Sequence, residues 1–192
     1  MPAFRSLAAA AALAAAVSLG ACSKGDDNGA NANATGNADA SHRTLAATIG
    51  NAPGLTTLST ALSEAGLADV FDGPGSYTLL APDDDAFAKV DNKALTDPAN
   101  RAELVAVLRG HILPGHLTPD AIRKAIADKK GPVTMRTLAD SMVTFSADGD
   151  ALTATGADGA KAKIDGAALV ASNGVVLPLD GLVKSATPAK AS

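Results

Sequence analysis

The sequence predicts one α+β domain, in which helices come first and a mainly antiparallel β-sheet follows. Before residue 132, apolar residues recur at helical spacing in several stretches. After residue 132, short β-type segments are separated by Asp-Gly or Asn-Gly pairs, which favour the tight turns between antiparallel strands. A block of helices followed by a block of strands is typical of an α+β arrangement within one domain.

The first 22 residues indicate an export signal. Arg5 supplies positive charge, and the apolar segment from Leu7 to Leu19 is shorter than the roughly 20 residues that a membrane-spanning helix needs. The segment ends in "LGAC" (19–22), which resembles the bacterial lipobox, where the cysteine is acylated and becomes the mature N-terminus. Cys22 is the only cysteine, so no internal disulfide can form. We expect residues 1–22 to be a lipoprotein signal peptide with Cys22 lipidated; ordinary cleavage near Ala21, or an incidental thiol, is the alternative.

Residues 23–43, "SKGDDNGANANATGNADASHR", are rich in Asn, Ala, Gly and Asp and show no apolar periodicity. Such a composition predicts a flexible low-complexity tether. A flexible chain of about 20 residues spans about 25 Å on average, enough to hold a domain clear of lipid headgroups. We therefore expect a domain at 44–186 and a disordered tail at 187–192. The lipid anchor would place it in the cell envelope, attached to a membrane and facing the periplasm or the cell exterior.

Helices and one buried strand are expected at the start of the domain. Leu45 and Ile49 open a short helical turn. A second helix is predicted by apolar residues at helical spacing, namely Leu55, Leu58, Leu62 and Ala65. Gly66 is placed to end that helix. After the turn "DGPGS", the apolar segment "YTLLA" (77–81) predicts a buried strand.

Two later helices begin with a capping residue followed by proline, at Asp97-Pro98 and Thr118-Pro119. One face of the first carries Leu104, Val107, Leu108 and His111. The segment "GHILPG" (110–115) then breaks that helix into a strand-like stretch. The second helix has its apolar stripe at Ile122, Ala125 and Ile126, and Gly131-Pro132 is expected to end it.

The remaining β-type segments are expected at 133–138, 142–147, 151–155, 160–164, 167–171 and 174–179. The turn pairs between them are Asp148-Gly149, Asp158-Gly159, Asp165-Gly166 and Asn173-Gly174. Proline lacks a backbone N–H, so the strand that contains Pro178 must lie at a sheet edge or contain a bulge.

Three consecutive aspartates, Asp83, Asp84 and Asp85, follow the first expected strand. Consecutive helical side chains diverge by about 100°, so the three carboxylates cannot converge on one metal ion. Asp83 suits a helix N-cap, and the next two suit a first helical turn, where unpaired N–H groups favour negative charge. Phe87 and Val90 follow as the buried side. The aspartates therefore predict a helix start.

Three blocks of the sequence together resemble the fasciclin domain. The first signature block of that family is similar to "YTLLAPDDDAF" (77–87), and the last is similar to "ASNGVVLPLDGLV" (171–183). Between them, "LVAVLRGHILPG" (104–115) resembles the central helix-to-strand segment, and residues 44–71 match the paired N-terminal helices. The resemblance covers residues 44–186 and implies helices packed on a mainly antiparallel β-wedge. It also implies extracellular protein–protein or cell–matrix contact.

The resemblance further implies a binding segment near the central histidine, which here is His111, Ile112 and Leu113. Two departures from the family pattern affect that expectation. The family commonly carries Tyr-His in this segment, whereas this chain has Gly110 before its histidine. The last block usually reads His-Val-Ile-Asp, whereas this chain has "LPLD" (177–180).

Composition and motifs argue against several other kinds of chemistry. The formal net charge of −4 disfavours nucleic acid as a partner, and the aromatic content of 3% leaves few surfaces on which bases or sugars could stack. His111 and His116 lack zinc-ligand spacing, and His111 is expected to be semi-buried and hydrogen-bonded to backbone. There is no Gly-x-Ser-x-Gly nucleophile motif, and "GPGSYT" lacks the spacing of a dinucleotide loop. We therefore expect no catalytic residue, no metal and no cofactor.

The leading hypothesis is a non-catalytic module, anchored in the cell envelope, that mediates extracellular protein binding or adhesion to cells or matrix. The alternative is an envelope carrier that holds a small apolar ligand in the wedge between helices and sheet. A hydrolase is the third hypothesis, and it would need a nucleophile served by His111. The identity of the partner cannot be read from the sequence.

Overall fold

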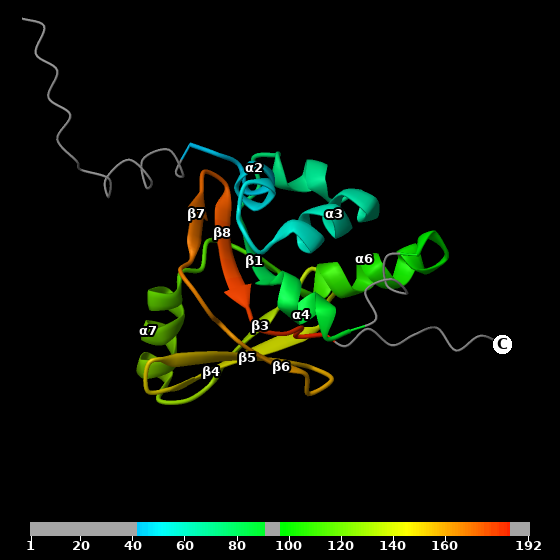
Figure 1. Ribbon diagram of the computed structural model, residues 1–192. Helices are drawn as coiled ribbons and strands as arrows, with labels where there is room; N and C mark the ends of the chain where they lie inside the picture. Colours follow the sequence, from blue (N-terminus) through cyan, green and yellow to red (C-terminus); the bar gives the residue numbers. More distant parts are fainter. Residues whose placement is uncertain (1–41, 91–96, 185–192) are drawn as a thin grey trace, which may run out of the picture. The chain divides into compact units, whose positions relative to one another are not determined.

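The structure, a computed structural model, describes residues 42–90 and 97–184. The expected signal peptide with Cys22, the tether up to residue 41 and the tail at 187–192 lie outside the described residues. The described residues form an α+β arrangement, as the sequence predicts (Figure 1).

The helices lie at the positions that the sequence predicts. They are α2 (Leu45–Gly50), α3 (Thr56–Ala65), α4 (Asp84–Ala88), α6 (Arg101–Gly110) and α7 (Pro119–Lys129), with 3-10 helices at Ala68–Phe71 and Pro98–Asn100. Gly66 ends α3 in the left-handed conformation, with φ 71°. Asp97 caps the 3-10 turn and α6 follows only at Arg101. The expected end of α7 is wrong by one residue, because Lys130 rather than Gly131 takes the left-handed conformation, with φ 55°.

The strands form two four-stranded sheets rather than the single meander that the sequence suggests. The first sheet has the order β2-β1-β8-β7, and its strands are β1 (Tyr77–Pro82), β2 (Ile112–Pro114), β7 (Leu169–Ala171) and β8 (Gly174–Leu179). The second has the order β3-β4-β5-β6, and its strands are β3 (Val133–Arg136), β4 (Met142–Asp148), β5 (Ala151–Gly156) and β6 (Lys161–Lys163). Among the pairings of named strands, only β1 with β8 is parallel. This central pair joins β1, which lies early in the described chain, to β8, which lies near its end.

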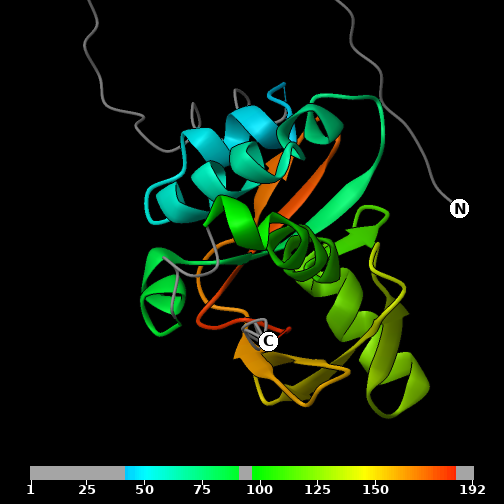
Figure 2. The same cartoon turned by 90° about the vertical axis from the view of Figure 1, so that its right-hand side faces the viewer.

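Apolar side chains fill both faces of the first sheet. On one face, α2, α3 and α6 pack against β1 and β8 through a cluster that includes Leu58, Leu79 and Val176. On the other face, Val175 and Leu177 of β8 join Phe145 of the second sheet and a residue of α7 in a second cluster. Figures 1 and 2 show the helices α2, α3 and α6 on one side of the first sheet and the second sheet on the other. The first sheet is thus the middle layer.

Pro178 shows how β8 can be central and still contain a proline. Strand β7 pairs with β8 only over Gly174–Val176, so β7 has ended before Pro178 is reached. The Pro178 carbonyl accepts a hydrogen bond from the Asp165 N–H at 2.9 Å. At its end β8 has β1 on one side and residues 163–165 on the other, where Ile164 forms a bridge with Leu179, so Pro178 does not lie at an open edge. Its carbonyl is used there, and only the bond that a backbone N–H at position 178 could donate is missing.

Candidate functional site

Asp83 caps α4, and Asp84 and Asp85 lie in its first turn, as the sequence predicts; Asp84 also contacts a second helix. Asp83 caps α4, since its carboxylate accepts a hydrogen bond from the Ala86 N–H at 2.6 Å. The carboxylate of Asp84 reaches the start of α3, where it accepts from the N–H of Thr57 at 2.7 Å and of Thr56 at 3.4 Å. That helix has no side-chain cap of its own. Asp85 is exposed, and within the described residues no group of His, Cys, Asp and Glu is arranged to hold a metal ion.

The protonation of Asp84 follows from this contact. Burial raises the pKa of its carboxyl, but the hydrogen bonds from Thr57 and Thr56 outweigh burial and hold the pKa below its ordinary value. The carboxylate is therefore charged at neutral pH and stabilises the positive end of α3.

His111 lies at the junction between α6 and the last described residues of the chain. Its side chain is 1% exposed. Its Nδ1 lies 2.9 Å from the Val107 carbonyl oxygen, and its Nε2 lies 3.0 Å from the Val183 backbone nitrogen. A carbonyl can only accept, and the backbone N–H can only donate. The neutral ring with its hydrogen on Nδ1 satisfies both partners.

Burial lowers the pKa of His111 to about 4. The Val107 carbonyl and the negative charge of Asp158 act in the opposite direction, and the positive charge of Lys184 adds to the lowering. The ring is therefore neutral at physiological pH and acts as a fixed connection. It is more deeply buried than the semi-buried position that the sequence predicts, but its backbone partners are as expected.

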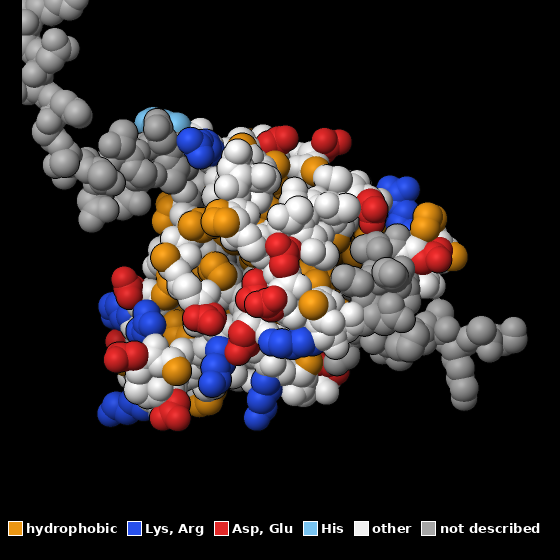
Figure 3. All heavy atoms as spheres, viewed as in Figure 1, with side chains coloured by type: hydrophobic (Ala, Val, Ile, Leu, Met, Phe, Trp, Pro, Cys, Tyr) orange, Lys and Arg blue, Asp and Glu red, His pale blue; other side chains and the backbone are white. Residues whose placement is uncertain are grey.

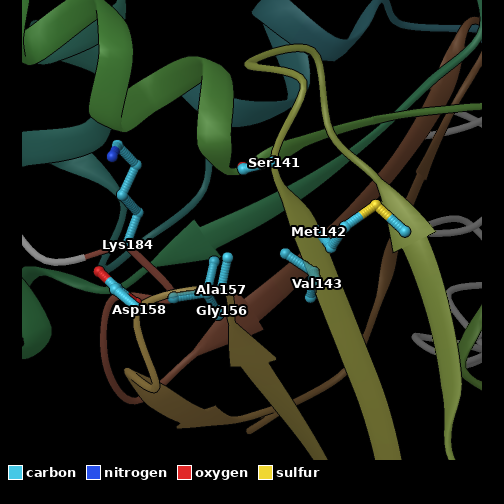
Figure 4. Close-up of a pocket in the computed structure, with 8 residues that line it drawn as sticks. Ser141, Met142, Val143, Gly156, Ala157, Asp158 and Lys184 are labelled. Carbon is cyan, nitrogen blue, oxygen red and sulfur yellow. The ribbon is translucent and has the colours of Figure 1, made fainter.

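A small hollow of about 90 Å³ lies beside this junction. It is lined by Ser141, Met142, Val143, Gly156, Ala157, Asp158, Val183 and Lys184 (Figure 4). Figure 4 shows Asp158 and Lys184 on one side of it and Met142 and Val143 on the other. The hollow lies between the second sheet and the last described residues of the chain, Val183 and Lys184, which we call the C-terminal segment.

Two glycines make room for that segment. A Cβ at Gly156 would collide with the Val183 carbonyl, and a Cβ at Gly110 would lie 2.8 Å from Cδ of Lys184. The Lys184 stem thus occupies the space where a side chain at position 110 would begin.

The expected binding segment is buried. His111, Ile112 and Leu113 are 1%, 1% and 0% exposed. Ile112 belongs to the cluster under the helices and Leu113 to the cluster between the sheets. A partner on the folded surface does not touch these side chains. A binding role for this segment stays a prediction.

Comparison with known proteins identifies the family. A model of the family described as "Fasciclin domain" matches residues 53–184. This chain belongs to the fasciclin domain family. The transforming growth factor-beta-induced protein ig-h3 of Sus scrofa is 32% identical over 131 residues, which are 66% of this chain and 17% of that protein. Protein sll1483 of Synechocystis is 27% identical over 132 residues, which are 67% of this chain and 66% of that protein.

The fold of a solved fasciclin structure agrees with this assignment. A FAS1 domain pair from the insect cell adhesion molecule Fasciclin I has a TM-score of 0.67 to this chain, at 13% identity. The match covers 76% of this chain and 52% of that structure. Over the residues described here, no helix is both long and apolar enough to cross a membrane.

Proposed function

We propose that this protein is a non-catalytic fasciclin module, held at the cell envelope by a lipid on Cys22, that binds extracellular protein or matrix and so mediates adhesion. The observation that carries the proposal is the family assignment over residues 53–184. The solved structure with the matching fold comes from an insect cell adhesion molecule. Because the chain spans only 17% of the ig-h3 protein, the proposal concerns one domain and not the activity of that whole protein.

The chemistry of His111 supports a role without catalysis. A general base needs an accessible nitrogen and a pKa near the working pH. Both ring nitrogens of His111 are engaged by backbone groups, and its pKa is about 4. The carboxylates of Asp83 and Asp84 are likewise engaged by helix N–H groups.

The anchor rests on the "LGAC" sequence at 19–22. Metabolic labelling with an alkyne-bearing fatty acid in a lipoprotein-producing bacterium tests it. The wild-type chain should carry the label, and Cys22→Ser should not. An unlabelled wild-type chain that is released into the medium would contradict the anchor.

Crosslinking on living cells tests the binding role. The anchored protein should crosslink to a reproducible extracellular partner, and excess unlabelled protein should compete with that product. Crosslinks only to its own membrane neighbours, without competition, would contradict the proposal.

Carriage of a small apolar ligand has less support. The space between the helices and the first sheet is filled by core side chains, among them Leu45, Leu58 and Phe71, each 0% exposed. Native mass spectrometry of protein purified from its own host would reveal a bound ligand, and a co-purifying mass would revive this alternative.

A further inference from the structure

The outer face of the second sheet is polar. Successive side chains of a strand point to opposite faces. The inward residues of β4, β5 and β6 are apolar and buried, and they are Val143, Phe145, Leu152, Ala154 and Ala162. The residues between them point outward, and they are Thr144, Ser146, Thr153, Thr155, Lys161 and Lys163.

Strand register arranges these outward residues in two rows across the sheet. Ser146 pairs with Thr153, which pairs with Lys163. Thr144 pairs with Thr155, which pairs with Lys161. Each row therefore runs from hydroxyl to hydroxyl to ammonium. Neighbouring strands lie about 4.8 Å apart, and the two rows lie about 7 Å apart along the strands.

The surface is hollowed where the rows approach β6. A groove of about 380 Å³ is lined by Ser146, Thr153, Thr155, Lys161, Ala162, Lys163 and Asp180. In Figure 3, Lys and Arg side chains are interspersed with Asp and Glu side chains over the lower part of the view, where Figure 1 shows α7 and the second sheet. We call this hollow the hydroxyl–lysine groove.

The two lysine side chains of the groove form no ion pair within the described part of the domain. Lys161 and Lys163 are both exposed. At the far end of one row, by contrast, the hydroxyls of Thr134 and Thr144 bond to each other at 3.1 Å. The lysines are thus available to an outside partner.

Asp180 supplies the carboxylate that lines the groove, and it is committed to the sheet. Its Oδ1 accepts from the Lys163 N–H at 2.7 Å, and its own N–H donates to the Lys163 carbonyl at 3.1 Å. These two bonds occupy the outer edge of β6. A peptide strand therefore cannot add to β6 at this point.

The composition of the groove selects among partners. Hydroxyls in rows can donate to and accept from sugar hydroxyls, and ammonium groups pair with carboxylates. No aromatic side chain lines the groove, so neither bases nor sugar rings have a surface on which to stack, and a ligand must be held through its polar groups. The only apolar lining residue, Ala162, is 1% exposed, which leaves nothing to insert into a lipid layer.

We propose that the hydroxyl–lysine groove binds an anionic polysaccharide, with Lys161 and Lys163 on its carboxylates and Ser146, Thr153 and Thr155 on its hydroxyls. The binding itself does not depend on the proposed adhesion function. Its biological role does, because the polysaccharide would be the matrix component to which the protein adheres.

Calorimetric titration of the full chain, purified in mild detergent, with polygalacturonate tests the inference. The wild type should bind, and Lys161→Ala/Lys163→Ala should bind roughly tenfold more weakly or not at all. Thr153→Val/Thr155→Val keeps the β-branched shape and should bind a few-fold more weakly. The matched control, Lys124→Ala/Lys129→Ala, removes two exposed lysines of α7, which packs against the inner face of the sheet, and should bind like the wild type.

Three further probes separate the sources of binding. Uncharged dextran and vesicles of phosphatidylglycerol should not bind at the groove, and poly-glutamate should bind more weakly than polygalacturonate. Any one of three results would overturn the inference. The first is that poly-glutamate binds as well as polygalacturonate and the threonine variant has no effect. The others are that the protein prefers vesicles, or that the folded double-lysine variant binds as well as the wild type. Adhesion of cells is measured separately, so a failure here leaves the proposed function standing, and the reverse also holds.

Discussion

Protonation of His111 should make the domain lose stability in mild acid. The unfolded chain binds a proton on this ring with a pKa near 6.5, whereas the folded chain does so only near 4. Between these values the unfolded state holds more protons, so the free energy of unfolding falls as the pH falls. The stabilisation is complete above pH 6.5 and is lost progressively down to pH 4. Linkage over this interval gives a loss of about 2 kcal/mol between pH 7.5 and pH 5.

Urea unfolding followed by circular dichroism measures this loss. The wild type and His111→Gln are unfolded at a series of pH values between 7.5 and 5. Glutamine can still accept from the Val183 N–H but does not titrate, so the difference between the two curves isolates the ring. We expect the variant to be less stable at pH 7.5 by about 1–3 kcal/mol, because it disturbs a buried hydrogen-bonded group.

The gap between the two proteins should close by about 2 kcal/mol as the pH falls to 5. Titrating groups that do not interact with His111 contribute equally to both curves and cancel. A constant gap across the whole range would show that His111 titrates alike in the folded and unfolded chains. The structural account of a buried neutral ring would then be wrong.

Three other substitutions test contacts of the fold by the same unfolding assay. Gly156→Ala should lower the free energy of unfolding by more than about 2 kcal/mol, because the new Cβ would collide with the Val183 carbonyl. The control Gly131→Ala should leave the free energy of unfolding nearly unchanged, because a Cβ there meets no other atom, and equal effects of the two substitutions would refute the contact. Asp84→Asn should cost about 1 kcal/mol by weakening the cap on α3, and exposed Asp85→Asn should change little; the reverse order would contradict the assignment. Asn173→Ala should lower the free energy of unfolding by about 2–4 kcal/mol, because the Asn173 side chain hydrogen-bonds to backbone atoms of Leu45, Phe71 and Gly73. A loss below about 0.5 kcal/mol would contradict a stabilising role for these hydrogen bonds.

Features that depend on neighbouring residues could be predicted from the sequence. Thr118 caps α7 by accepting from Ala121, three residues on, and Gly66 ends α3 by its own conformational freedom. The Asp-Gly turns have left-handed glycines for the same local reason, at Gly149, Gly159 and Gly166. In each case the energy of a few adjacent residues decides the conformation.

Contacts between distant residues could not be predicted in this way. Nothing near Asp84 shows that it caps a helix 27 residues earlier, and nothing near His111 shows that Val183 will be its partner. Asn173-Gly174 has the pattern of a turn pair, yet Gly174 does not have a positive φ. Glycine is required at position 174 because a Cβ there would collide with the Tyr77 carbonyl of the parallel partner strand.

The candidate site shows the same division. The alternation of Lys161 and Lys163 predicts a half-exposed strand, and the structure confirms it. Their alignment with Thr155 and Thr153 depends on the register of two hairpins, which the lysines themselves do not reveal. The rows of the hydroxyl–lysine groove therefore became visible only once the strand pairing was known.

Retention of living cells under flow tests whether the lipid-anchored domain mediates adhesion. A strain that lacks the protein is complemented with the wild type or with Cys22→Ser, and the fraction of cells held on a matrix-coated surface is measured as shear increases. We expect the wild type to restore retention, whereas the unanchored variant, although folded and secreted, should not. Equal retention of the deleted strain and the complemented strains would contradict it.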